Sequence, residues 1–151
     1  RTFMVDVGLK EGSMFQDEMA SFYKNSIRFS LDRQATSADI AKVLSQITQD
    51  DQVVIAIHDS RLRPGNNMPL NADLKGMITN MVAKDATFVL FANPYNLASM
   101  PGIENAKALL VAYQKEGFMQ KAAASVLKHQ LIPTGKLPVT ASSFFKYGEG
   151  L

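Results

Sequence analysis

Three uninterrupted apolar runs of strand length limit the folds open to this chain more than any other feature. The runs are residues 53–57, 86–91 and 108–113, and they are rich in Val, Ile, Leu and Phe. Strands covered on both faces lack apolar–polar alternation, and such strands are typical of parallel sheets. Residues 2–7 and 27–31 are predicted as two further strands, and the second alternates as an edge strand does. The pattern predicts a mostly parallel sheet, in which Val54 is expected to be buried on both sides.

Segments of helical periodicity separate the strands. The first follows Ser13, where Ser13 and Gln16 form a predicted capping box and Phe15, Met19 and Phe22 share one face. Two more helices follow Thr36 and Asn71, and a fourth is predicted over residues 118–129. The apolar positions of these three helices are Ile40, Val43, Leu44 and Ile47, then Leu74, Met77, Ile78, Met81 and Val82, and finally the small Ala122 and Ala123 with Val126.

This strand–helix alternation predicts an α/β fold, a three-layer flavodoxin-like sandwich. Right-handed crossovers place helices on both faces of a mostly parallel sheet of five or six strands. A sixth strand would have to come from residues 137–140, where Pro138 restricts it to an edge. We assign residues 1–151 to a single α/β domain.

Composition excludes several classes of function. The chain is 46% hydrophobic and 20% charged, and its 16 Lys and Arg residues against 14 Asp and Glu residues give a net charge of +2. That balance lacks the basic excess of a nucleic-acid-binding protein, so no nucleic acid is expected as a partner. The absence of cysteine removes thiol nucleophiles and thiolate metal sites. No apolar stretch approaches the ~20 residues that span a bilayer. Because the chain opens on Arg1 rather than Met, we expect it to be a fragment of a larger protein.

The loop after the central strand carries the candidate site residues. Sheets of this kind bind ligands beyond the carboxyl ends of their strands, where the strand order reverses. The loop at residues 58–70 places His58, Asp59, Arg61 and Arg63 there. Consecutive residues at one strand end cannot form a Ser/His/Asp triad, which needs the histidine between the other two groups, so no catalytic residue is assigned. The four residues are predicted to lie near a substrate or a domain interface, with Arg61 and Arg63 solvated in this chain.

Other cofactor and metal sites are not predicted. The loop from Gly8 to Ser13 lacks the spacing of a phosphate or dinucleotide loop. The two histidines, His58 and His129, are far apart and form no ligand cluster. A phosphate-accepting receiver domain would need an acidic pair after the first strand, and only Asp6 is present there. No cofactor and no metal are therefore expected.

The carboxyl-terminal half resembles a known family. Five segments match in order and spacing the carboxyl-terminal α/β domain of glycoside hydrolase family 3. They are Ala-Asn-Pro-Tyr-Asn-Leu at 92–97, Ala-Leu-Leu-Val-Ala-Tyr at 108–113, Gln-Lys-Ala-Ala-Ala-Ser-Val-Leu at 120–127, Pro-Thr-Gly-Lys-Leu-Pro-Val-Thr at 133–140 and Phe-Lys-Tyr-Gly-Glu-Gly-Leu at 145–151. The first ninety residues agree with this family in architecture rather than in motif.

The resemblance implies a catalytic partner outside this chain. In that family an amino-terminal (β/α)₈ barrel carries the carboxylate nucleophile, and 151 residues fall short of the ~250 of such a barrel. β-Glucosidase-like members also take a glutamate acid/base from the loop after the third strand of this domain. The matching loop here, residues 58–70, has Asp59 and no glutamate. The departure resembles the β-N-acetylhexosaminidase branch, in which a His/Asp pair of the barrel transfers the proton.

On this resemblance we expect an accessory domain of a bacterial O-glycosyl hydrolase of carbohydrate metabolism. The resemblance implies that the isolated domain is inactive, that its partners are the barrel and a carbohydrate substrate, and that the parent is periplasmic or secreted. Some bacterial members of the branch continue into a β-lactamase-like domain, which would come after Leu151. The alternative interpretation is a free-standing flavodoxin-like binding or signalling module.

Overall fold

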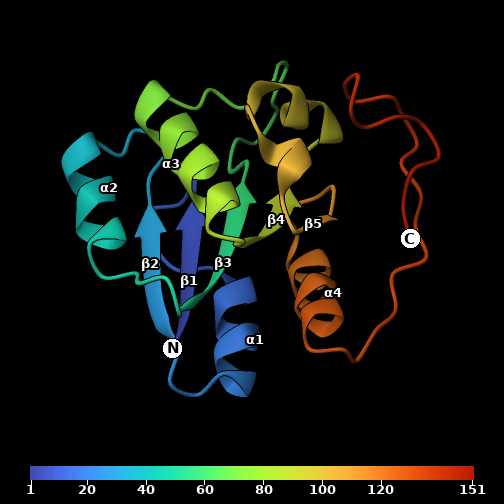
Figure 1. Ribbon diagram of the computed structural model, residues 1–151. Coiled ribbons are helices and arrows are strands. Elements are labelled where there is room, and N and C mark those ends of the chain that lie inside the picture. Colours follow the sequence, from blue (N-terminus) through green and yellow to red (C-terminus); the bar gives the residue numbers. More distant parts are fainter.

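The computed structural model describes all 151 residues and contains a five-stranded, fully parallel sheet in the order β2-β1-β3-β4-β5 (Figure 1). The strands are β1 (Thr2–Val7), β2 (Ile27–Leu31), β3 (Gln52–His58), β4 (Thr87–Phe91) and β5 (Ala108–Val111). The predicted α/β three-layer sandwich is confirmed. Residues 137–140 form no strand, so the sheet stops at five.

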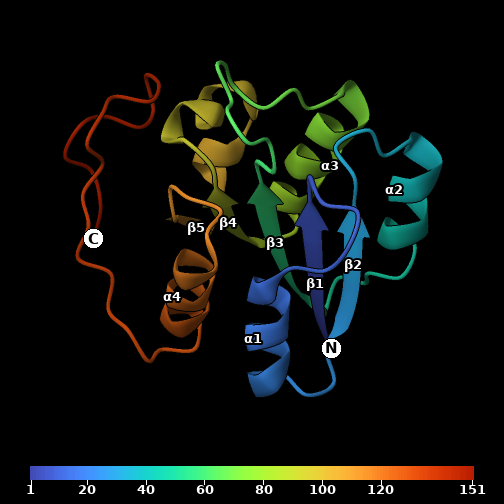
Figure 2. The ribbon, with the colours of Figure 1, turned by 180° about the vertical axis from the view of Figure 1, so that it is seen from behind.

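Helices cover both faces of the sheet. One face carries α1 (Met14–Phe22) and α4 (Gly117–Leu127), and the other carries α2 (Ser37–Leu44) and α3 (Ala72–Ala83), as the opposite views show (Figure 1; Figure 2). Two short 3₁₀ helices, η1 (Pro94–Ser99) and η2 (Ile103–Asn105), fill the connection between β4 and β5 beside α3. None of these helices has the length and apolar character needed to cross a membrane.

The sheet separates two apolar layers. The larger layer, against α2 and α3, contains Phe3, Ile55 and Phe88 together with the predicted α3 positions Leu74, Met77, Ile78 and Met81. The smaller layer, against α1 and α4, buries Met4, Phe15, Met19, Ala56, Val89, Phe91, Ala112, Ala123 and Ala124. On α4 the most buried residues are Ala123 and Ala124, whereas Ala122 and Val126 are only partly covered, which corrects the predicted face by one position.

The start of α1 departs from the predicted capping box. Ser13 Oγ accepts a hydrogen bond from the Gln16 amide at 3.1 Å, as expected of a helix cap. The Gln16 side chain does not reach back to Ser13. Its Nε2 donates instead to the carbonyl oxygens of Met4, at 3.2 Å, and Phe29, at 2.8 Å. Gln16 therefore fastens the helix to two strands, a role that requires tertiary structure and has no local sequence signal.

Three further expectations need correction at element ends. Phe22, predicted to share one face with the buried Phe15 and Met19, is the last residue of α1, is 51% exposed and contacts Tyr23 edge-on. α4 ends at Leu127, because His129 has a φ of +57° in the left-handed region, where a helix cannot continue. β5 is an edge strand and is only half buried, because no strand covers its outer side.

Candidate functional site

The strand order reverses between β1 and β3, and here the two strand ends touch. Gly8 follows β1 with a φ of +97°, and its amide donates to the Leu31 carbonyl at 2.8 Å. A Cβ atom at Gly8 would lie 2.2 Å from the carbonyl oxygen of His58. Only glycine tolerates both the φ and the contact, so Gly8 allows the end of β1 to press against the end of β3.

A buried acid–histidine pair joins the same two strands. His58 Nε2 lies 3.0 Å from Asp6 Oδ1, and the side chains are 2% and 0% exposed. The Ser13 amide donates to the other Asp6 oxygen at 2.9 Å, and the His58 ring stacks on Phe91 with 4.8 Å between ring centroids. Asp6 thus links the start of α1 to the end of β3. This role of Asp6 was not predicted, although a single carboxylate inside an apolar strand was a signal that it needed a partner.

A second pair organises the loop after β3. Arg61 donates from Nε and Nη2 to the two carboxylate oxygens of Asp59, both at 2.8 Å. It also donates to the side-chain and backbone oxygens of Asn66, at 2.8 and 2.7 Å. Lys115 Nζ donates a hydrogen bond to the Arg61 carbonyl oxygen at 2.9 Å. The Arg61 guanidinium therefore links Asp59 at the start of the loop to Asn66 further along it.

The charges of this pair reinforce each other. Partial burial alone would raise the pKa of Asp59, but the hydrogen bonds from Arg61 outweigh burial and lower it. The hydrogen bond to Asp59 in turn raises the pKa of the Arg61 guanidinium. Both groups are charged at neutral pH, and the carboxylate is held as a hydrogen-bond acceptor rather than as a proton donor.

The expectation that both arginines are solvated is wrong for Arg61. Its side chain is 20% exposed and its hydrogen bonds go to its own loop, because the chain turns back at Asn66 and brings that amide against the guanidinium. Arg63 is exposed and makes no side-chain hydrogen bond or ion pair. Its neighbour Leu62 is 91% exposed. Of the four candidate residues, His58 and Asp59 are buried. The Arg61 side chain is hydrogen-bonded within the loop, and the Arg63 side chain is exposed without a hydrogen-bond partner.

We expect the two arginines to differ in their contribution to stability. Arg61→Ala leaves the Asp59 carboxylate without its partner and should reduce the free energy of unfolding by about 1–3 kcal/mol. Arg63→Ala removes no contact and should change it by no more than about 0.5 kcal/mol. Urea unfolding of the 151-residue chain, followed by far-ultraviolet circular dichroism, measures both. Equal effects would show that the Asp59–Arg61 pair does not form in solution.

Side chains of the 58–70 loop pack against the ends of β1 and β3, where the strand order reverses. Met68 is 3% exposed, and its sulfur lies 3.6 Å from the position that a Gly8 Cβ would take. Ser60 Oγ donates to the Gly8 carbonyl at 3.2 Å, and the Met68 amide donates to Asn96 Oδ1 at 2.6 Å. The structure gathers no three His, Asp or Glu side chains in a metal-ligating arrangement. The 58–70 loop thus packs against the ends of β1 and β3 at the strand switch.

Large apolar side chains project instead around this edge of the sheet. We call them the carboxyl rim, and they are Met14 (42% exposed), Leu62 (91%), Tyr95 (45%) and Phe118 (65%). Each follows a different strand, namely β1, β3, β4 and β5. The rim thus collects exposed apolar groups from four separate segments at one end of the sheet.

Hydrogen bonds connect the segments of the carboxyl rim. The Phe15 amide, beside Met14, donates to Gln120 Oε1 of α4 at 2.9 Å. Lys115, just before α4, binds the Arg61 carbonyl, and Asn67 Nδ2 of the same loop donates to the Tyr95 carbonyl at 3.1 Å. These hydrogen bonds therefore join the four segments to one another.

No family model and no curated protein matches the chain. Among solved structures, it is similar to a glycoside hydrolase family 3 β-N-acetylglucosaminidase from Paenibacillus sp. str. FPU-7, with a TM-score of 0.66 and 19% sequence identity over 87% of this chain. The chain shares the fold of that part of the enzyme. It spans 25% of the length of the enzyme chain. The likeness agrees with the fold implied by the five sequence segments in the carboxyl-terminal half.

Proposed function

We propose that residues 1–151 form an accessory α/β domain of a family 3 glycoside hydrolase of the β-N-acetylhexosaminidase-like branch. The parent would hydrolyse O-glycosyl bonds of a carbohydrate and carry its catalytic (β/α)₈ barrel outside this chain. One agreement carries the proposal. The ordered segments within residues 92–151 resemble this family, and a solved family 3 enzyme shares the fold over 87% of the chain. In the similar enzyme, the matched region leaves three quarters of the polypeptide for other domains.

The state of the carboxylates supports an accessory role. Most glycoside hydrolases use two carboxyl groups that flank the scissile bond, and in the branch proposed here a His/Asp pair of the barrel takes the place of the proton-donating carboxyl group. At this edge of the sheet Asp6 is bound to His58 and Ser13, and Asp59 is bound to Arg61. Neither carboxylate is available to a substrate. A free-standing flavodoxin-like module remains the alternative, and at its strand switch the buried Met68 lies beside Gly8.

We place the barrel against the carboxyl rim. Exposed large apolar side chains that gather at one end of a sheet favour an interface at that end. Arg63 stands free beside them, and a guanidinium forms several directed hydrogen bonds to carboxylate or sugar oxygens. In this arrangement Leu62 and Arg63 reach the barrel, while Arg61 and Asp59 hold the loop in shape. The β-lactamase-like domain that the resemblance implies after Leu151 stays a prediction.

Activity should reside in the parent and not in this chain. The full-length enzyme is expected to release the aryl group from an aryl β-N-acetylglucosaminide, and the purified 151-residue chain to show no turnover. Turnover by the chain alone, free of contaminating enzyme, would contradict the assignment of catalysis to the barrel. Absence of glycosidase activity in the full-length protein would contradict the family proposal itself.

The contribution of Arg63 can be measured in the same parent enzyme. Arg63→Ala should lower kcat/KM by about tenfold, the effect of losing one charged hydrogen bond worth about 1.4 kcal/mol. Lys24→Ala is the matched control, because Lys24 is an exposed cation without a side-chain partner on the α1–β2 loop, at the opposite edge of the sheet. Unchanged kinetics in the Arg63 variant would show that this part of the loop is solvated surface.

A further inference from the structure

The outer edge of β5 carries unpaired backbone groups. β5 pairs only with β4, and the Ala112 amide donates to the Leu90 carbonyl at 2.8 Å. Because successive residues of a strand direct their amides to opposite sides, the amides and carbonyls of Leu109 and Val111 face away from β4. No backbone hydrogen bond from another segment reaches either residue. Both residues are half buried, so these polar groups lie in a partly apolar environment.

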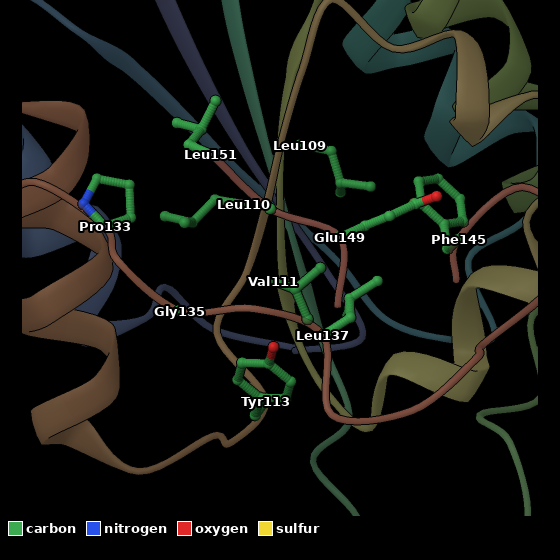
Figure 3. Close-up of a pocket in the computed structure, with 11 residues that line it drawn as sticks. Leu109, Leu110, Val111, Tyr113, Pro133, Gly135, Leu137, Phe145, Glu149 and Leu151 are labelled. Atoms are coloured by element: carbon green, nitrogen blue, oxygen red, sulfur yellow. The ribbon is translucent and has the colours of Figure 1, made fainter. Parts of the chain in front are cut away.

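A groove of about 380 Å³ lies directly over this edge (Figure 3). Leu109, Leu110 and Val111 form one wall, and the carboxyl-terminal segment forms the other with Leu137, Phe145 and Leu151. The groove is thus apolar along its sides and lined by free hydrogen-bonding groups of the backbone at its base. That combination matches an extended peptide, whose backbone pairs with an edge strand while alternate side chains enter apolar pockets.

One acidic side chain lies in this mostly apolar lining. The exposed Glu149 side chain points toward Phe145 in the close-up, and its carboxylate has no ion pair and no hydrogen bond (Figure 3). The Lys136 ammonium does not pair with Glu149, since it donates to the backbone oxygens of Gly150 and Leu151 at 3.1 and 2.5 Å. A cationic side chain on the occupant would complement the Glu149 carboxylate.

We propose that an extended segment of the parent polypeptide, outside residues 1–151, binds this groove as an additional strand beside β5. The segment carries apolar residues at alternate positions and a Lys or Arg opposite Glu149. This inference rests on the proposed function, in which most of the parent lies outside the chain.

Hydrogen exchange of the full-length parent tests the proposal, read at single-residue resolution over residues 108–113. Pairing should slow the Leu109 and Val111 amides to within about tenfold of Leu110, whose amide faces β4. Glu149→Lys places like charges together and should accelerate the exchange of Leu109 and Val111 by at least about tenfold, while Leu110 stays protected. Asp50→Lys, which makes the same charge change at an exposed residue before β3, should have no effect.

Two outcomes overturn the inference. Rapid exchange of Leu109 and Val111 in the unmodified parent would mean that the edge stays open. Protection that persists in Glu149→Lys but disappears in Val139→Pro would mean that residues 137–140 of this chain cover the edge themselves. Glycosidase activity of the same preparations separates these outcomes from failure of the proposed function, because loss of the strand would leave an active hydrolase.

Discussion

Ile55→Asp is expected to abolish folding of the 151-residue chain. Ile55 lies in β3, between β1 and β4, and its side chain is 0% exposed. An unpaired carboxylate at such a site costs several kcal/mol, a large part of the ~5–15 kcal/mol that stabilises a domain. Far-ultraviolet circular dichroism and urea unfolding should show a chain without a cooperative transition at 25 °C.

Val54→Asp provides the matched control on the same strand. Val54 was expected from the sequence to be buried on both sides, but the structure leaves it half buried on the α1/α4 face near the amino end of β3. Its replacement should therefore destabilise the chain clearly less than Ile55→Asp and leave a measurable transition. If Ile55→Asp melted within a few degrees of the unmodified chain, the placement of β3 at the centre of the sheet would be wrong.

Asp6→Ala is expected to be the most damaging change of a polar residue. It leaves two buried groups without a partner, the His58 ring nitrogen and the Ser13 amide. Breaking a buried pair by removing one member costs about 3–5 kcal/mol, and chemical denaturation would measure the loss. Asp73→Ala, at an exposed carboxylate in the first turn of α3, should cost less than about 1 kcal/mol.

A double-mutant cycle separates the pair from the rest of the site. Asp6→Ala combined with His58→Phe replaces both members by apolar groups, so the second change should recover part of the stability lost in the first. Strictly additive effects would show that Asp6 and His58 are not energetically coupled, in spite of the 3.0 Å between them.

Local patterns predicted most of the fold, because periodicity reports directly which residues face an apolar layer. The four most buried positions of α3, Leu74, Met77, Ile78 and Met81, were all identified from their spacing. The same signal was incomplete at β5. Leu109 and Val111 pack against the larger layer and Leu110 against the smaller one, as a strand covered on both faces requires, but all three are only partly buried because β5 is the edge strand. Hydropathy reports contact with apolar atoms and not the place of a strand in its sheet.

The candidate site was less accessible to prediction from the sequence. Asp6 and His58 are 52 residues apart, and only the alignment of β1 with β3 brings them together. Arg61 was identified as a loop guanidinium, but its partners depend on a turn that no periodicity describes. Arg63 was placed correctly on the surface. Loop residues whose role depends on tertiary hydrogen bonds cannot be distinguished from solvated ones by residue type alone.

The bonds that tie the carboxyl rim together bear on how tightly it can hold a neighbour. Loops that move independently must lose conformational entropy when they associate, and each immobilised side chain subtracts about 0.5–1.5 kcal/mol from the affinity. Here Lys115 fixes the 58–70 loop to the segment before α4, and Asn67 fixes it to the segment after β4. Much of that ordering is completed when the domain itself folds. A rim ordered in this way would lose little conformational entropy on binding the second domain that we propose, which favours a single orientation of the two domains.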